Sequence, residues 1–103
     1  MPSVEITSET TISEAVLKIL VTTASGEGTI AYLRNRIPEY VELSDADRQM
    51  STTRPNEEIW EQRLRNIRSH VKSEGNFINL GYLTAPSRGR LRITEAGRRY
   101  AQA

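Results

Sequence analysis

The sequence predicts a single domain with a mostly helical α+β fold, and three observations carry that expectation. The chain has 103 residues, of which 37% are hydrophobic and 26% charged, and this composition suits one modest core. Apolar residues recur at helical spacing over about residues 12–24, 30–37 and 57–74. Apolar and polar residues then alternate beside turn-forming residues at about 84–93, which indicates a β-hairpin.

A capping box precedes the first predicted helix. In Thr11-Ile12-Ser13-Glu14 a hydroxyl side chain stands three residues before a glutamate, a pairing that satisfies free N–H groups at a helix start. We therefore expect this helix over about residues 12–24. The polar residues 1–10 are expected to form a flexible N-terminus, which leaves 11–103 as the domain. The predicted buried face of the helix consists of Ile12, Ala15, Val16, Ile19 and Leu20.

A break at Ser25-Gly26-Glu27-Gly28 separates the first helix from the second. Thr29 is the expected cap of the second helix, and Pro38 ends it. A variable segment at about 38–56 follows, in which Ser44-Asp45-Ala46-Asp47 has the composition of a capped start of a short helix. The predicted buried stripe of the second helix consists of Ile30, Leu33 and Ile37.

The third helix, expected over about 57–74, has the clearest pattern. Asn56 is a suitable N-cap, and Gly75 is a suitable residue to end the helix. The apolar residues are spaced by four, three and four positions, as one buried face requires. That face consists of Trp60, Leu64, Ile67 and Val71.

The C-terminal part predicts a hairpin and a last helix. The first strand is expected within 77–83, and Pro86 and Gly89 mark the turn. In the second strand Leu91 and Ile93 face the core. Thr94 caps a final short helix that ends at Tyr100. A three-helix core followed by a β-hairpin wing and a short helix is the winged helix-turn-helix arrangement, in which the later helix of the pair enters the DNA major groove.

The distribution of charge favours an anionic partner for the C-terminal half. The whole chain has a net charge of +1, but residues 1–56 carry −3 and residues 57–103 carry +4. On the third helix, polar side chains suited to base edges occupy the exposed centre and cations suited to phosphates occupy one flank. The alternative is an ordinary solvated helix face. The base-edge candidates are Gln62, Asn66 and Ser69, and the phosphate candidates are Arg65, Arg68 and Lys72.

Three arginines at alternating positions give the hairpin its own positive charge. Arg88 lies at the turn, while Arg90 and Arg92 face outward because Leu91 and Ile93 face inward. No acid lies between Glu74 and Glu95. Charge on an edge strand can also serve only to prevent aggregation. We expect at least one of the three arginines to contact phosphate.

Several other kinds of function lack the residues they need. The chain has no cysteine and one histidine, so we expect no metal site, no cofactor and no small-molecule substrate. Ser69 and His70 are adjacent on a helix and point apart, so they do not form a nucleophile–base pair. No apolar run reaches the length of a membrane span, and the first residues lack a basic segment followed by an apolar one, so we expect no signal peptide. We expect a cytoplasmic protein that is not an enzyme.

A tryptophan-bearing helix is followed by a Gly-Tyr-Leu step, a short basic turn and an Ile-Thr-Glu-Ala-Gly-Arg segment. These are Trp60, Gly81-Tyr82-Leu83, Arg88-Gly89-Arg90 and Ile93-Thr94-Glu95-Ala96-Gly97-Arg98, and the Leu43-Ser44 start of a short helix fits the same pattern. With these residues most of the chain, and best residues 60–100, resembles the winged-helix domain at the N-terminus of Mrr-type restriction proteins. The resemblance implies a DNA-recognition module without the carboxylate-and-lysine motif of a nuclease. The step from Gly75 to Asn79 is longer than in the simplest winged helices.

The sequence thus predicts binding of double-stranded DNA by a recognition helix at about 57–74 and an Arg-rich wing at about 84–93. Such a module could serve a restriction system or the regulation of transcription. The alternative is a winged-helix module for protein–protein interaction or homodimerisation, because a net charge of +1 is low for a strong DNA binder.

Overall fold

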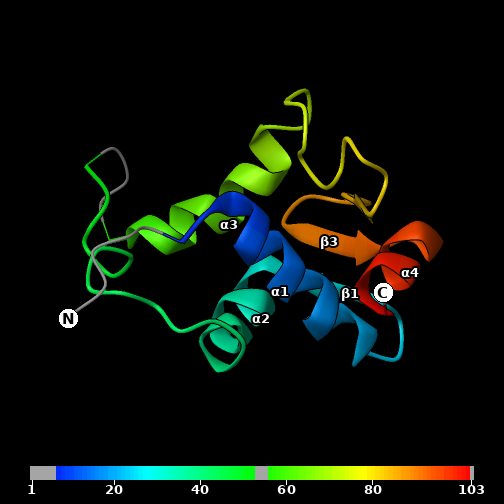
Figure 1. Ribbon diagram of the computed structural model, residues 1–103, viewed down its shortest axis with the longest axis horizontal. Coiled ribbons are helices and arrows are strands. Elements are labelled where there is room, and N and C mark those ends of the chain that lie inside the picture. Colours follow the sequence, from blue (N-terminus) through cyan, green and yellow to red (C-terminus); the bar gives the residue numbers. More distant parts are fainter. Residues whose placement is uncertain (1–6, 53–55, 103) are drawn as a thin grey trace.

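The computed structural model describes residues 7–52 and 56–102, and these residues form four α-helices and a three-stranded antiparallel sheet (Figure 1). The fold class is α+β, as the sequence predicts. In chain order the elements are α1 (Glu9–Val21), β1 (Glu27–Thr29), α2 (Ile30–Arg36), the 3-10 helix η1 (Ile37–Glu39), α3 (Ile59–Ser69), β2 (Leu83–Thr84), β3 (Arg90–Ile93) and α4 (Glu95–Gln102).

The α1 helix crosses the centre of the molecule and packs against α3 and α4 (Figure 1). It begins earlier than predicted, because Ser8 rather than Thr11 is the N-cap: Ser8 Oγ accepts a hydrogen bond from the Thr11 N–H at 3.1 Å. The predicted end at residue 24 is also three residues too late. Residues 1–6 lie outside the described part of the chain. The predicted face is buried, and it consists of Ile12, Ala15, Val16, Ile19 and Leu20.

The sheet has the order β1-β3-β2, and both pairs are antiparallel. Thr29 of β1 faces Arg90 of β3, and Leu83 of β2 faces Ile93. The β1 strand was not predicted, because its three residues were interpreted only as a break between helices. Pairing with a strand more than sixty positions away in the sequence creates it.

The second helix starts as predicted. Thr29 is its N-cap and accepts a hydrogen bond from the Tyr32 N–H at 3.0 Å. Leu33 and Ile37 are buried, whereas Ile30 is only half-buried. The α-helix ends at Arg36 and continues as the 3-10 helix η1, which contains Pro38.

The connection between α2 and α3 is anchored by a buried carboxylate. Two reciprocal hydrogen bonds join Ser44 and Asp47. The Ser44 N–H donates to the Asp47 carboxylate at 2.9 Å, and the Asp47 N–H donates to the Ser44 hydroxyl oxygen at 3.1 Å. Thr7 donates its N–H and its hydroxyl to the Asp47 carboxylate, both at 2.6 Å. The predicted short helix is wrong, since residues 45–48 form one turn.

The structure shortens the third helix at both ends. The N-cap is Glu58 in a capping box with Glu61, and the predicted cap Asn56 lies two residues earlier at a φ of 66°. The helix ends at Ser69 rather than near 74. The side-chain amide of Asn76 donates to the Ile67 carbonyl oxygen at 2.9 Å. This bond satisfies one of the carbonyl groups in the last turn of the helix, which have no partner within the helix. Trp60, Leu64 and Ile67 are buried as predicted, while Val71 is half-buried and lies beyond the helix.

The first hairpin strand is shorter than predicted. Residues 77–80 form turns, and only Leu83 and Thr84 belong to β2. Phe77 is buried, but Leu80 is 47% exposed. Thr94 accepts a hydrogen bond from the Gly97 N–H at 3.0 Å, as expected of a helix cap, and α4 continues to Gln102 instead of stopping at Tyr100.

Candidate functional site

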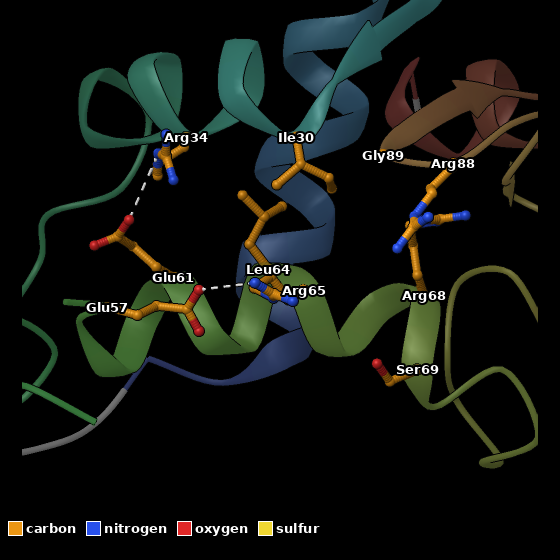
Figure 2. A pocket seen from close by; sticks show the side chains of 10 residues that line it. All are labelled: Ile30, Arg34, Glu57, Glu61, Leu64, Arg65, Arg68, Ser69, Arg88 and Gly89. Atoms are coloured by element: carbon orange, nitrogen blue, oxygen red, sulfur yellow. Dashed lines mark hydrogen bonds and ion pairs between the residues drawn. The ribbon is translucent and has the colours of Figure 1, made fainter. Parts of the chain in front are cut away.

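A pocket of about 290 Å³ lies where α3, the start of α2 and the hairpin tip meet (Figure 2). The exposed flank of α3 forms one wall, and α2 and the hairpin form the wall opposite it (Figure 2). The lining residues are Ile30, Arg34, Glu57, Glu61, Leu64, Arg65, Arg68, Ser69, Arg88 and Gly89.

Hydrogen bonds to backbone carbonyl oxygens hold the hairpin tip against both helices. The first N–H of α2, at Ile30, donates to the Gly89 carbonyl oxygen at 2.8 Å. Arg68 of α3 donates from Nη2 to the Ser87 carbonyl oxygen at 3.3 Å. Gly89 has a φ of 74°, a conformation that favours glycine, so the turn that places the tip here needs this residue. The pocket therefore depends on contacts among three separate elements.

The charges in the pocket are divided between its two ends. Near the start of α3, Arg65 Nη1 lies 3.3 Å from Glu57 Oε2, and Arg34 Nε lies 3.6 Å from Glu61 Oε2. Near the end of α3, Arg68 and Arg88 extend toward each other (Figure 2). The first end is thus neutralised by acids, and the second end carries the positive charge.

Comparison with known protein families identifies the domain. A family model described as the Mrr N-terminal domain matches residues 10–103, nearly the whole chain. The chain belongs to this family. The match associates it with restriction systems, as the sequence resemblance implies. No match was found among curated proteins or among solved structures.

Four of the nine predicted site residues line the pocket of this Mrr N-terminal domain. They are Arg65, Arg68 and Ser69 from α3 and Arg88 from the hairpin tip. Lys72 does not join them, because α3 ends before it and leaves it exposed in the following turn.

Gln62 and Asn66 lie on α3 outside the pocket lining, and both are half-buried. Gln62 Oε1 accepts a hydrogen bond from the Ser51 hydroxyl at 3.0 Å, which ties α3 to the preceding connection.

Arg90 and Arg92 lie on the outer face of β3, as predicted from the burial of Leu91 and Ile93. Arg90 Nη1 forms an ion pair with Glu27 Oε2 at 3.3 Å. Arg92 is exposed and stands opposite Glu27 in the β1–β3 register. Neither arginine lines the pocket, so the three hairpin arginines do not act as one group.

Sequence reasoning missed the second helix as part of the site. Arg34 and Ile30 reach the pocket only because β1 pairs with β3 and brings the start of α2 to the hairpin tip. Glu57 and Glu61 were not among the predicted site residues, although they form ion pairs with arginines of the pocket. A three-residue strand gives no sequence signal from which this arrangement could be found.

Two groups with shifted pKa values lie outside the pocket of the Mrr N-terminal domain. Burial raises the pKa of Asp47, but the hydrogen bonds from Thr7 and Ser44 together outweigh it, so the pKa of that carboxyl lies below its usual value. The Tyr100 hydroxyl donates to Glu14 at 2.8 Å, and this bond raises the tyrosine pKa. Within the described part of the chain, no helix has the length and apolar content to cross a membrane.

Proposed function

We propose that this Mrr N-terminal domain binds double-stranded DNA, with α3 as the recognition helix and the β2–β3 hairpin as a wing. The observation that carries the proposal is the convergence of four arginines from three elements on one pocket beside the polar face of α3. Arginine is well suited to phosphate because its planar guanidinium offers several donors in a fixed geometry. Restriction systems act on DNA, so the family membership supports the same conclusion.

The order of the elements supports a winged helix-turn-helix description. The described residues run α1, β1, α2, α3, β2, β3, and β3 lies between the other two strands (Figure 1). In helix-turn-helix proteins the later helix of the pair enters the major groove. Here the connection from α2 to α3 is longer than a simple turn and contains the Asp47 anchor. We therefore assign the major groove to α3 and the adjacent backbone or minor groove to the hairpin.

The side chains of α3 divide into two roles. Gln62, Asn66 and Ser69 are the candidates for base edges, because amides and hydroxyls both donate and accept hydrogen bonds. The phosphate candidates are Arg65, Arg68, Lys72 and Arg88, while Arg90 and Arg92 extend the positive charge along β3.

We further propose a recognition role rather than an enzymatic one, in the cytoplasm, for a restriction or regulatory system. The pocket has one hydroxyl side chain, Ser69, and no histidine among its lining residues, so no nucleophile–base pair lies there.

Exposed apolar side chains favour the second candidate function, protein–protein interaction or homodimerisation. Met50 is 54% exposed and Leu80 is 47% exposed. Isolated exposed apolar residues are common on protein surfaces, so this observation supports the candidate less strongly than the pocket supports DNA binding. The mass measured by gel filtration with light scattering tests self-association directly.

Fluorescence anisotropy with a labelled mixed-sequence duplex tests DNA binding. Three or four neutralised phosphates predict that the logarithm of the affinity falls with the logarithm of salt concentration with a slope of about −2.7 to −3.6. The Arg65→Gln variant should bind more weakly than wild type, with a shallower slope. Arg99→Gln is the matched control, because Arg99 lies on α4 and does not line the pocket. Absence of duplex binding at low salt would refute the proposal.

A further inference from the structure

The end of the pocket at Arg68 and Arg88 carries a positive charge that no acid among the described residues balances by an ion pair. The two acids of the pocket, Glu57 and Glu61, lie toward the start of α3 and already contact Arg65 and Arg34 (Figure 2). Within the described residues, neither Arg68 nor Arg88 forms an ion pair. Two like charges that share one end of a pocket disfavour each other unless an anion lies with them.

Contacts hold the Arg68 guanidinium at this end. Its Nη2 donates to the Ser87 carbonyl oxygen, so the side chain reaches the residue next to Arg88. Its Nε is covered from solvent and has no hydrogen-bond partner within the described residues. Water therefore screens this cation less than it screens an arginine that extends freely into solvent, and the positive potential at this end of the pocket is correspondingly stronger.

We infer that Arg68 and Arg88 together bind one phosphate group, a phosphodiester of the DNA backbone that lies at this end of the pocket. This inference rests on the proposed DNA binding. Two guanidinium groups that approach from opposite walls can donate to different oxygens of the same phosphate. The phosphate supplies the negative charge that this end of the pocket lacks.

Sharing of one phosphate has a measurable consequence that two separate contacts do not have. Each phosphate that a protein neutralises on duplex DNA contributes about 0.9 to the salt slope. If Arg68 and Arg88 share one phosphate, either single substitution leaves the phosphate partly neutralised, and the double substitution reduces the slope by about 0.9. If they contact two phosphates, each single substitution reduces the slope by about 0.9 and the double by about 1.8.

The experiment measures duplex affinity over a salt series for wild type, Arg68→Gln, Arg88→Gln, the double variant and the Arg99→Gln control. Glutamine keeps much of the side-chain length and removes the charge. Thermal unfolding by circular dichroism checks that Arg68→Gln remains folded. We expect the double variant to bind about tenfold to a hundredfold more weakly at low salt, as loss of charged hydrogen bonds predicts. Arg99→Gln should stay within about twofold of wild type, as expected for a site outside the interface.

The slopes of the single and double variants together decide between a shared phosphate and separate contacts. A reduction of the slope near 0.9 in the double variant, with a smaller reduction in each single variant, supports the shared phosphate. A reduction near 1.8 in the double variant, a full reduction of about 0.9 in one single variant, or no reduction overturns it while DNA binding itself stands. If wild type binds no duplex, DNA binding and the shared phosphodiester are both refuted, and titration with inorganic phosphate followed by amide NMR shows whether Arg68 and Arg88 bind a phosphate group at all. Shifts at Ser69 and residues 87–89 that vanish in the double variant then support an anion site. Absence of those shifts overturns it.

Discussion

Glu61 on α3 lies 3.6 Å from the Arg34 guanidinium on α2 and so places an acid in a pocket lined by four arginines. Its other carboxylate oxygen accepts a hydrogen bond from the Glu58 N–H at 3.1 Å, which completes the capping box of α3. One side chain thus stabilises the helix start and lowers the positive charge of the pocket at the same time.

Replacement of this acid should strengthen DNA binding. Glu61→Gln keeps an oxygen for the capping hydrogen bond but removes the negative charge that repels phosphate. We expect duplex affinity to rise about twofold to fivefold at low salt and the gain to shrink as salt screens the charge. Glu95→Gln on α4 is the control, because Glu95 pairs with Arg99 away from the pocket. Anisotropy titrations with unchanged or weaker binding for Glu61→Gln would contradict the pocket as the DNA-contacting surface.

Core packing beneath α3 makes a prediction about stability. Ile67 is fully buried, so Ile67→Ala removes buried methyl groups and leaves a cavity. The free energy of unfolding should fall by about 2–5 kcal/mol. Leu80→Ala, at a side chain that is 47% exposed, should change it by less than about 0.5 kcal/mol. Urea denaturation measures the free energy of unfolding of both variants. Equal decreases in the two variants would show that the core is not packed as described.

For the substitution Gly97→Ala, helix propensity predicts a gain in stability, whereas packing predicts a loss. A Cβ at this position would overlap the backbone carbonyl oxygen of Tyr82. Alanine is favoured over glycine in a helix by about 1 kcal/mol, yet we expect Gly97→Ala to destabilise the domain by more than about 1 kcal/mol. Ala96→Gly at the neighbouring exposed position measures the local propensity effect alone. A raised melting temperature for Gly97→Ala would disprove the close approach of α4 to residue 82.

The Asp47 carboxylate should make stability depend on pH in acid. Its pKa is lower in the folded chain than in the unfolded chain, because the hydrogen bonds from Thr7 and Ser44 favour the charged form. Its contribution is therefore complete above the unfolded pKa of about 4 and is lost as the pH falls through the lower folded pKa.

Asp47→Asn should lower the free energy of unfolding at pH 7 by about 1–3 kcal/mol, because the amide replaces a charged acceptor of three donors. The difference from wild type should narrow as the pH falls from 4 to 2. Urea denaturation at several pH values measures it. A difference that stays constant over this range would show that the charge of Asp47 does not stabilise the fold.

Local sequence signals predicted the parts of the fold that local interactions determine. Thr29 and Thr94 cap their helices as expected, because a hydroxyl at a helix start needs only residues within the next turn. The alternation of Leu91 and Ile93 with Arg90 and Arg92 likewise gave the correct buried face of β3. The ends of α1 and α3 were wrong by two to five residues, because Ser8 and Glu58 rather than Thr11 and Asn56 are the N-caps and both helices end before the predicted breaks.

Elements that depend on distant contacts could not be predicted. The three residues of β1 become a strand only through β3, and that pairing brings Arg34 of α2 to the pocket. The helical wheel correctly placed Arg65 and Arg68 on one flank of α3, but it could not show that Arg88 faces them from the hairpin. Arg90 was grouped with Arg88 by sequence, whereas the structure pairs it with Glu27.

The hydrogen bond from Ile30 to Gly89, together with the β1–β3 pairing, makes the hairpin tip and the start of α2 one mechanical unit. The tip cannot swing about its strands without breaking contacts of the helix beside it. The backbone at Arg88 is therefore held beside α3 before any ligand arrives. Little backbone conformational entropy is lost on binding at this position, so the backbone is preorganised where the positive charge of the pocket is concentrated.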